Sequence, residues 1–292
     1  MCCTFTRSEM SNTRIYVGEA QRQGKLVHVL AYQNTAISKG PNAMVLPFPT
    51  ETRMGQENVI DTRKFKNFLK DIGEATRHQT KGMRRGSMML GSRGMDSDSL
   101  AEVFDVGSYT VVLAENVWQI PEALSRVSLE KRPNVTSDFL IGYSELYPEQ
   151  PIAVCCWDGS IEAEPLMWWY EPRNKDTLFI PTMDAHDGKA PKLGTPVNYD
   201  HILSVGSTTG NMGSEVHYSQ TRSIPDEVRD LLPLRVHGKQ LPEVLTNGDC
   251  FVKTAPLHST RDQMWSGGAP AVELVQAPGT KRAYATVMNG WS

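Results

Sequence analysis

The fold class is set by one short stretch, Pro41-Asn42-Ala43-Met44-Val45-Leu46-Pro47-Phe48-Pro49-Thr50. Its apolar centre, residues 43–46, is too short for an ordinary helix and suits a buried strand. The prolines that follow end this strand because proline cannot donate a hydrogen bond to a neighbouring strand. A second apolar run covers residues 24–32, and residues 40–42 supply turn chemistry between the two runs. The sequence therefore predicts a strand, a loop, a second strand and a rigid exit.

Similar short runs recur downstream, at residues 152–157, 166–170 and 177–180. The last of them is followed by Pro181-Thr182, so that Leu178-Phe179-Ile180-Pro181-Thr182 resembles Leu46-Pro47-Phe48-Pro49-Thr50: in both, an apolar run stops at Pro-Thr. A duplicated half-domain would produce this echo, and so would the general tendency of apolar runs to stop at proline.

Helical periodicity is limited to a few segments. Short helices are expected after Asp61 and Ser137 as N-caps, with Pro121 in a first turn, and from Pro225 onward. Residues 103–113 and 197–207 each suit one strand, the first with a glycine bend. The expected fold class is α+β and mainly β, with short, mostly antiparallel strands packed with two or three helices and an internal duplication as an open alternative.

Length and composition fit a soluble globular protein. The chain has 292 residues, 22% of them charged and 39% hydrophobic, and a net charge of −3. We expect one globular unit over residues 1–292, with halves 1–100 and 101–292 as the alternative. The sequence has no apolar run of the roughly 20 residues that span a bilayer and no secretory signal at its start, so no membrane partner is expected. Five cysteines, four of them in adjacent pairs, favour a reducing, cytoplasmic location.

One segment departs from the overall charge balance. Residues 61–93 hold nine Lys or Arg against three acidic residues, which gives +6. Such a segment can bind an anionic partner, including nucleic acid, or can be an ordinary solvated helix face. Residues 81–99 add four glycines and little apolar periodicity, which predicts an exposed, mobile loop. Arg84, Arg85 and Arg93 are the candidate partner-binding residues, and the partner expected is a protein, with a homo-oligomer as one form of it.

Acidic residues and histidines gather after the second Pro-Thr exit. The candidate metal ligands are Asp184, His186, Asp187, Asp200 and His201. Imidazole and carboxylate together form a common shell for a divalent metal. The same residues can instead form a hydrogen-bonded corner, because loop acids often accept hydrogen bonds from nearby backbone N–H groups. We expect residues 177–181 to pair with residues 199–205, which would bring the two acid–histidine pairs together. No cofactor other than such a metal is expected.

The start of the chain offers a candidate nucleophile. If the initiator methionine is removed, the α-amino group of Cys2 can act as a base for its own thiol. Cys2-Cys3-Thr4-Phe5, followed by Asn12-Thr13-Arg14-Ile15-Tyr16-Val17-Gly18, resembles the opening of N-terminal-cysteine hydrolases of the bile-salt hydrolase kind. That resemblance implies a catalytic Cys2. The sequence departs from the pattern at Glu19-Ala20, where those enzymes place an Arg-Asn pair.

A second resemblance covers the first fifty residues. Cys2-Cys3, the strand over residues 26–32 and Ala43-Met44-Val45-Leu46-Pro47-Phe48-Pro49-Thr50 resemble an uncharacterised bacterial family with an early cysteine pair and a strand that ends in Leu-Pro-x-Pro. This resemblance implies a β-rich domain and no chemistry.

The sequence contains no P-loop, no Gly-x-Ser-x-Gly elbow and no His-Glu-x-x-His. The leading hypothesis is therefore a soluble, non-catalytic binding or assembly protein. The alternatives are an N-terminal-cysteine hydrolase and a metal-dependent enzyme that uses Asp184, His186 and His201.

Overall fold

The computed structural model describes residues 3–77, 101–210, 213–240, 244–258 and 275–276. Strands make up 42% and helices 18% of the structure, with antiparallel pairing dominant. The predicted class, α+β and mainly β, is confirmed. None of the helices described is both long enough and apolar enough to span a bilayer.

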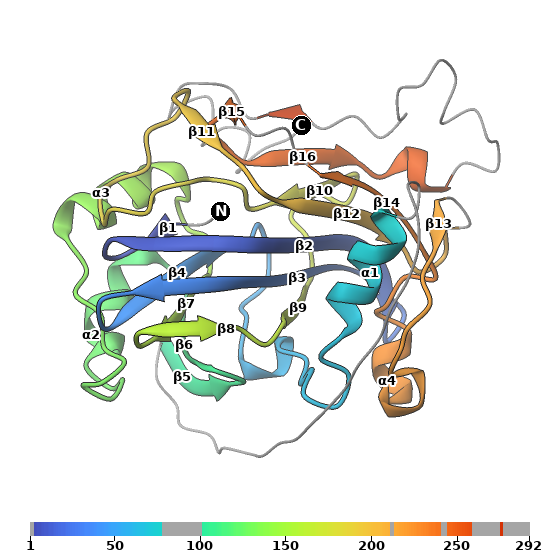
Figure 1. The fold of residues 1–292 in the computed structure, drawn as a ribbon, viewed down its shortest axis with the longest axis horizontal. Helices are drawn as coiled ribbons and strands as arrows, with labels where there is room; N and C mark the ends of the chain where they lie inside the picture. The colour runs from blue at the N-terminus through green and yellow to red at the C-terminus, as the bar shows by residue number, and fades with distance from the viewer. Residues whose placement is uncertain (1–2, 78–100, 211–212, 241–243, 259–274, 277–292) are drawn as a thin grey trace.

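A seven-stranded sheet is built around one long hairpin (Figure 1). Its path is β13-β14-β12-β2-β3-β8, and β9 also pairs with β3. The strands are β2 (Ser8–Arg22), β3 (Lys25–Ser38), β8 (Ser160–Glu162), β9 (Leu166–Tyr170), β12 (Ile202–Ser207), β13 (Ser214–Glu215) and β14 (Arg235–Gln240). Gln23 and Gly24 both have positive φ, at 52° and 78°, as a tight hairpin turn between twisted strands requires. β12 runs parallel to β2, and its own neighbour β14 is antiparallel.

A second sheet has five antiparallel strands in the order β1-β4-β7-β6-β5. They are β1 (Cys3–Thr4), β4 (Asn42–Pro47), β5 (Ala101–Val106), β6 (Tyr109–Ala114) and β7 (Ile152–Trp157). The expected strand, loop and strand over residues 24–46 is present as β3 and β4. The single strand expected over residues 103–113 is wrong: Gly107, at φ 55°, turns the chain into the β5–β6 hairpin.

Two small sheets complete the β structure. One joins β10 (Thr177–Ile180), β16 (Cys250–Lys253) and β17 (Val275–Gln276), and the other joins β11 (Pro196–Asn198) to β15 (Val244–Thr246). The strand expected over residues 197–207 is therefore two strands in different sheets. The two Pro-Thr exits also differ, because β4 pairs on both edges in the five-stranded sheet whereas β10 pairs with β16 in another. This difference counts against a duplicated half-domain.

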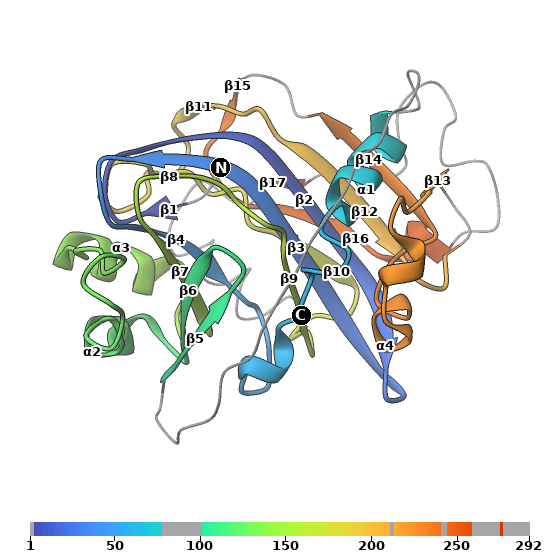
Figure 2. The ribbon, with the colours of Figure 1, turned by 60° about the horizontal axis from the view of Figure 1, so that its bottom comes forward.

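The helices lie outside the two large sheets (Figure 2). They are α1 (Phe68–Arg77), α2 (Ile120–Leu124), α3 (Ser137–Leu146) and α4 (Asp226–Arg229), with short 3-10 turns at Gln56–Asn58, Val117–Gln119, Thr221–Ser223 and Ala255–His258. Three apolar clusters follow from these layers. The first lies between the sheets, the second between the five-stranded sheet and α2 and α3, and the third between the seven-stranded sheet and α1 and α4.

Two helix starts differ from expectation. Asp61 does not begin a helix: its carboxylate binds the guanidinium of Arg63 at 2.6–2.7 Å, and α1 begins at Phe68. The cap of α3 is Thr136 rather than Ser137, because the Thr136 hydroxyl accepts a hydrogen bond from the Phe139 N–H at 3.1 Å. Pro121 lies in the first turn of α2, as expected.

Each of the two large sheets contains strands from before and from after residue 100 of the sequence. The five-stranded sheet places β1 and β4 beside β5, β6 and β7, and the seven-stranded sheet places β2 and β3 between β12 and β9. A boundary between residues 1–100 and 101–292 therefore does not follow the strand pairing.

His28 illustrates how tightly the space between the sheets is filled. It lies on β3 opposite Tyr170 of β9, is 1% exposed, and meets the Tyr170 ring edge-on with centroids 5.9 Å apart. Burial disfavours the charged imidazole and lowers the pKa of His28 to about 4. The residue is part of the core.

This depressed pKa predicts a loss of stability in acid. The unfolded chain takes up the His28 proton near its ordinary pKa of 6.5, whereas the folded protein resists it down to about 4. Stability is therefore complete above pH 6.5 and is lost as the pH falls towards 4, by about 3 kcal/mol. His28→Leu should reduce this loss in urea unfolding at pH 7, 5.5 and 4. The exposed His217 supplies the control, and an equal effect of His217→Leu would contradict the assignment.

Candidate functional site

The candidate site forms where a loop after β10 crosses the start of the chain. We call this loop, residues 181–194, the strap. Its backbone holds the first residues that the structure describes: the Thr4 N–H donates to the Ala185 carbonyl at 2.8 Å, and the Ser8 N–H donates to the His186 carbonyl at 3.1 Å. Cys3 also forms an isolated parallel bridge with Ala185. The strap therefore continues the five-stranded sheet beyond β1.

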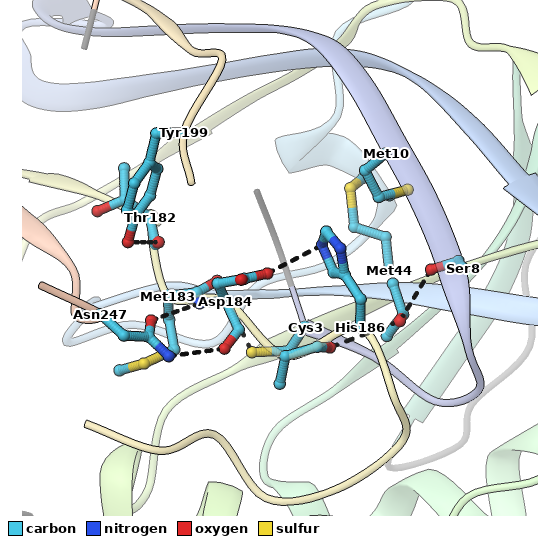
Figure 3. Close-up of polar contacts among 12 residues, drawn as sticks. Cys3, Ser8, Met10, Met44, Thr182, Met183, Asp184, His186, Tyr199 and Asn247 are labelled. Carbon is cyan, nitrogen blue, oxygen red and sulfur yellow. Dashed lines mark hydrogen bonds and ion pairs between the residues drawn. The ribbon is translucent and has the colours of Figure 1, made fainter. Parts of the chain in front are cut away.

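Asp184 and His186 form an acid–imidazole pair on the strap (Figure 3). Asp184 Oδ1 lies 3.1 Å from His186 Nε2, and the two side chains are 16% and 19% exposed. Burial raises the pKa of Asp184 to about 6, and the neighbouring Asp187 adds to the rise. Such a pair can orient an imidazole for proton transfer or for metal ligation.

Asn247 fixes the backbone of this pair. Its side-chain oxygen accepts the Asp184 N–H at 2.8 Å, and its side-chain nitrogen donates to the carbonyls of Asp184 and Lys192 at 2.8 and 3.0 Å. Sequence reasoning missed Asn247. The only signal was the Asn-Gly-Asp turn at residues 247–249 between two short strands, which does not reveal what the side chain contacts.

Asp249 anchors the beginning of the strap and was also missed. One carboxylate oxygen accepts the N–H groups of Thr182 and Met183 at 2.7 and 2.8 Å, and the other accepts the Tyr147 hydroxyl at 2.6 Å. The side chain is fully buried, and that burial raises its pKa to about 7 despite the three donors. Asp249 thus joins β16, the strap and α3 at one point.

The remaining predicted metal ligands have structural partners elsewhere. Asp200 Oδ2 accepts the N–H of Asn12 at 2.7 Å, where β2 bulges and Asn12 takes a positive φ of 55°. His201 is fully buried, with Nδ1 3.4 Å from Asp200 Oδ1 and its ring edge-on to Tyr199. Asp187 is exposed and accepts the Lys189 N–H at 3.1 Å.

The pairing expected between residues 177–181 and 199–205 is wrong. β10 pairs with β16, whereas β12 pairs with β2 and β14. Across the residues that the structure describes, no group of three or more His, Cys, Asp and Glu is placed to hold a metal. Of the five candidates, the structure shows each histidine close to the acid of its own pair. The strand pairing that was expected to bring the two acid–histidine pairs together around a divalent metal is therefore not present among the described strands.

The four described cysteines, Cys3, Cys155, Cys156 and Cys250, are buried and form no disulfide with one another. Burial raises the pKa of the Cys156 thiol to about 12 and of the Cys250 thiol to about 11, so neither is an activated nucleophile. The candidates Cys2, Arg84, Arg85 and Arg93 and the loop over residues 81–99 lie outside the described residues.

Comparisons with known proteins add little. No protein-family model matches the chain, and no curated protein is similar to it. Among solved structures, the crystal structure of baculovirus P35 is similar over 72% of this chain and 68% of that chain, with 17% sequence identity and a TM-score of 0.42. A likeness this distant says nothing about what the present chain does.

The three donors to Asp249 lead to a test of its anchoring role. Asp249→Ala leaves two backbone N–H groups and one hydroxyl without their acceptor, so the free energy of unfolding should fall by about 3 kcal/mol or more. Asp249→Asn retains an oxygen for the two N–H groups and should cost about 1 kcal/mol. Urea unfolding at pH 7 measures both. Equal losses in the two variants would show that the oxygen does not anchor the strap.

Two glycines of the strap form a matched pair for testing its contact with the start of the chain. Gly188 and Gly194 have φ of 75° and 77°, but a Cβ on Gly188 would lie 2.4 Å from the Phe5 carbonyl oxygen, whereas one on Gly194 would meet nothing within 4 Å. Gly194→Ala should therefore cost about 1 kcal/mol, from backbone strain alone. Gly188→Ala should cost about 2 kcal/mol more, because the strap must move off residue 5. Thermal melting compares the two, and similar melting temperatures would refute the close approach.

Proposed function

We propose that this chain is a non-catalytic binding protein of the cytoplasm that recognises another protein. The observation that supports this proposal is the use of its polar groups. Asp200 supports a bulge, Asn247 and Asp249 hold the strap, and His28 and His201 are enclosed in the core. Groups that are committed to the fold in this way are not free to bind and release a substrate. The described cysteines are buried and form no disulfide with one another, which agrees with a reducing compartment.

The partner-binding segment proposed here is the glycine-rich, basic stretch over residues 81–99, with Arg84, Arg85 and Arg93 as its contacts. Its ends are set by described elements: α1 ends at Arg77 against the seven-stranded sheet, and β5 begins at Ala101 in the five-stranded sheet. The charge of the segment suits an acidic surface on the partner. A second copy of this chain, whose net charge is −3, is one such partner.

One observation favours a second candidate function, hydrolysis by Cys2. The Asp184–His186 pair lies on the strap, which is bonded to Thr4 only two residues after Cys2 in the sequence. An imidazole in that neighbourhood could serve as a base for the thiol at the start of the chain.

The binding proposal is tested by charge removal within the segment. A photo-crosslinking residue at position 88 identifies the partner in cells, and isothermal titration then measures the affinity of the two purified proteins. Replacing Arg84, Arg85 and Arg93 together by Ala should weaken binding about tenfold, because exposed charges contribute up to about 1 kcal/mol each. Sedimentation of the purified protein reports whether the partner is a second copy.

The control replaces three exposed lysines of the described surface, Lys25, Lys189 and Lys192, and should leave the affinity unchanged. An equal loss of affinity in the control variant would show that net charge alone, and not the segment, determines binding. Amide or ester hydrolysis by the purified protein, lost in both Cys2→Ser and His186→Gln, would overturn the binding proposal in favour of the hydrolase.

A further inference from the structure

The five-stranded sheet ends at β5, which has β6 on one side and no other strand of the described structure on its outer side (Figure 2). β5 pairs with β6 continuously from Ala101 to Val106, without a bulge, and it contains no proline. Proteins commonly protect an edge strand with a bulge or a proline, because its unpaired backbone can bind a further strand. Neither device interrupts β5, so its outer edge is a regular strand surface.

Val103 and Asp105 present their backbone groups at this outer edge. In an antiparallel pair, only every second residue exchanges hydrogen bonds with the strand opposite. The two-residue turn after Val106 makes residues 102, 104 and 106 the bonded ones, so the N–H and C=O groups of Val103 and Asp105 point away from β6. These outward groups make no hydrogen bond with any residue that the structure describes. Ala101 also faces outward, but its carbonyl accepts a hydrogen bond from the Arg126 guanidinium.

The side chains of β5 are incompletely covered on both faces of the sheet. Val103 is partly buried against the cluster under α2 and α3, and Val106 is partly buried against the cluster between the two large sheets. Phe104, between them, is 9% exposed. The side chains of an added strand would alternate between these two faces and extend both apolar clusters. The edge therefore favours a partner strand with apolar residues opposite Val103, Phe104 and Val106.

Two carboxylates give this edge a negative charge. Glu102 accepts the Gln56 N–H and Asp105 accepts the Thr110 hydroxyl, each at 2.7 Å, and both of these donors are neutral. Neither carboxylate forms an ion pair with a Lys, Arg or His of the described structure. A Lys or Arg on an added strand would lie across from each carboxylate, whereas an acidic residue there would be repelled.

We propose that the outer edge of β5 binds an extended, basic segment of a partner protein, which adds to the five-stranded sheet as an antiparallel strand. Hydrogen bonds to Val103 and Asp105 provide affinity, and the side chains provide specificity. From the residue opposite Val106 to the residue opposite Glu102, the matching segment is apolar, basic, apolar, apolar and basic. This surface is separate from the segment over residues 81–99, and either proposal can fail without the other.

Two synthetic peptides test this edge, with binding to the full chain measured by fluorescence anisotropy. The first has the central sequence Val-Lys-Val-Val-Lys, and the second has Val-Glu-Val-Val-Lys, which places an acid opposite Asp105. The wild-type protein should bind the first about tenfold more tightly, because the second replaces an exposed ion pair by a repulsion. Asp105→Lys should reverse this preference, which a side chain that only supports the fold would not do.

Val103→Pro tests the backbone contact. Proline removes the outward N–H of residue 103 but no hydrogen bond to β6, and proline is tolerated at such edge positions. The variant should bind the first peptide at least about tenfold more weakly. Val103→Thr is the matched control, because it keeps the N–H and a β-branched side chain and should bind like the wild type. In the wild type, the first peptide should also slow amide hydrogen exchange at residues 103 and 105.

Three results would overturn the proposal. One is equal affinity of the wild type for the two peptides, and another is exchange protection that spares residues 103 and 105. The third is a dimer, detected by sedimentation, that Val103→Pro dissociates, because it would place β5 of a second copy at this edge. If Val103→Pro fails to fold by circular dichroism, the peptide preference of Asp105→Lys and the exchange data decide.

Discussion

The backbone pairing between β2 and β3 is the interaction on which the rest of the structure depends. Their ladder runs from the Gln23–Gly24 turn to Ser8 and Ser38, and β12, β8 and β9 pair directly with it, while β14 pairs with β12. β12 adds to the free edge of β2, and β8 and β9 add to the free edge of β3. One face of the hairpin forms the core between the sheets and the other supports α1. The far end of the same hairpin carries Ser8 to the strap, where its N–H donates to the His186 carbonyl.

Two acidic side chains, Asp200 and Asp249, hold loops of this protein in place. Asp249 joins three elements because a carboxylate can accept several hydrogen bonds at once, and Asp200 stabilises a bulge that would otherwise leave a backbone N–H unpaired. Within residues 184–201, Asp184 and Asp200 each lie at an irregular corner of the backbone, held by Asn247 in one case and bonded to Asn12 in the other. Asp184 and His186 differ from the others because their side chains face each other near the surface.

Much of the secondary structure was predictable because residues close together in the sequence determine it. β4 and β7 read as apolar runs ended by turn residues, and Phe139 and Tyr143 revealed the buried face of α3. The errors arose where one backbone conformation decides the outcome, as at Gly107, or where a distant residue holds a turn, as Asp200 does for Asn12. For the site, the spacing of Asp184 and His186 predicted their proximity. Asn247 reaches it only through tertiary packing, so its role could not be predicted from the sequence.

The parallel alignment of β12 with β2 also constrains how the chain folds. Residues 14–19 acquire one of their two strand neighbours only from residues 202–207, so the edge of β2 stays open until most of the chain has left the ribosome. During synthesis this long strand, with its apolar centre at residues 15–17, is a template for pairing with other chains. We therefore infer slow folding with a late docking step, and a need for protection from aggregation while the second half is being made.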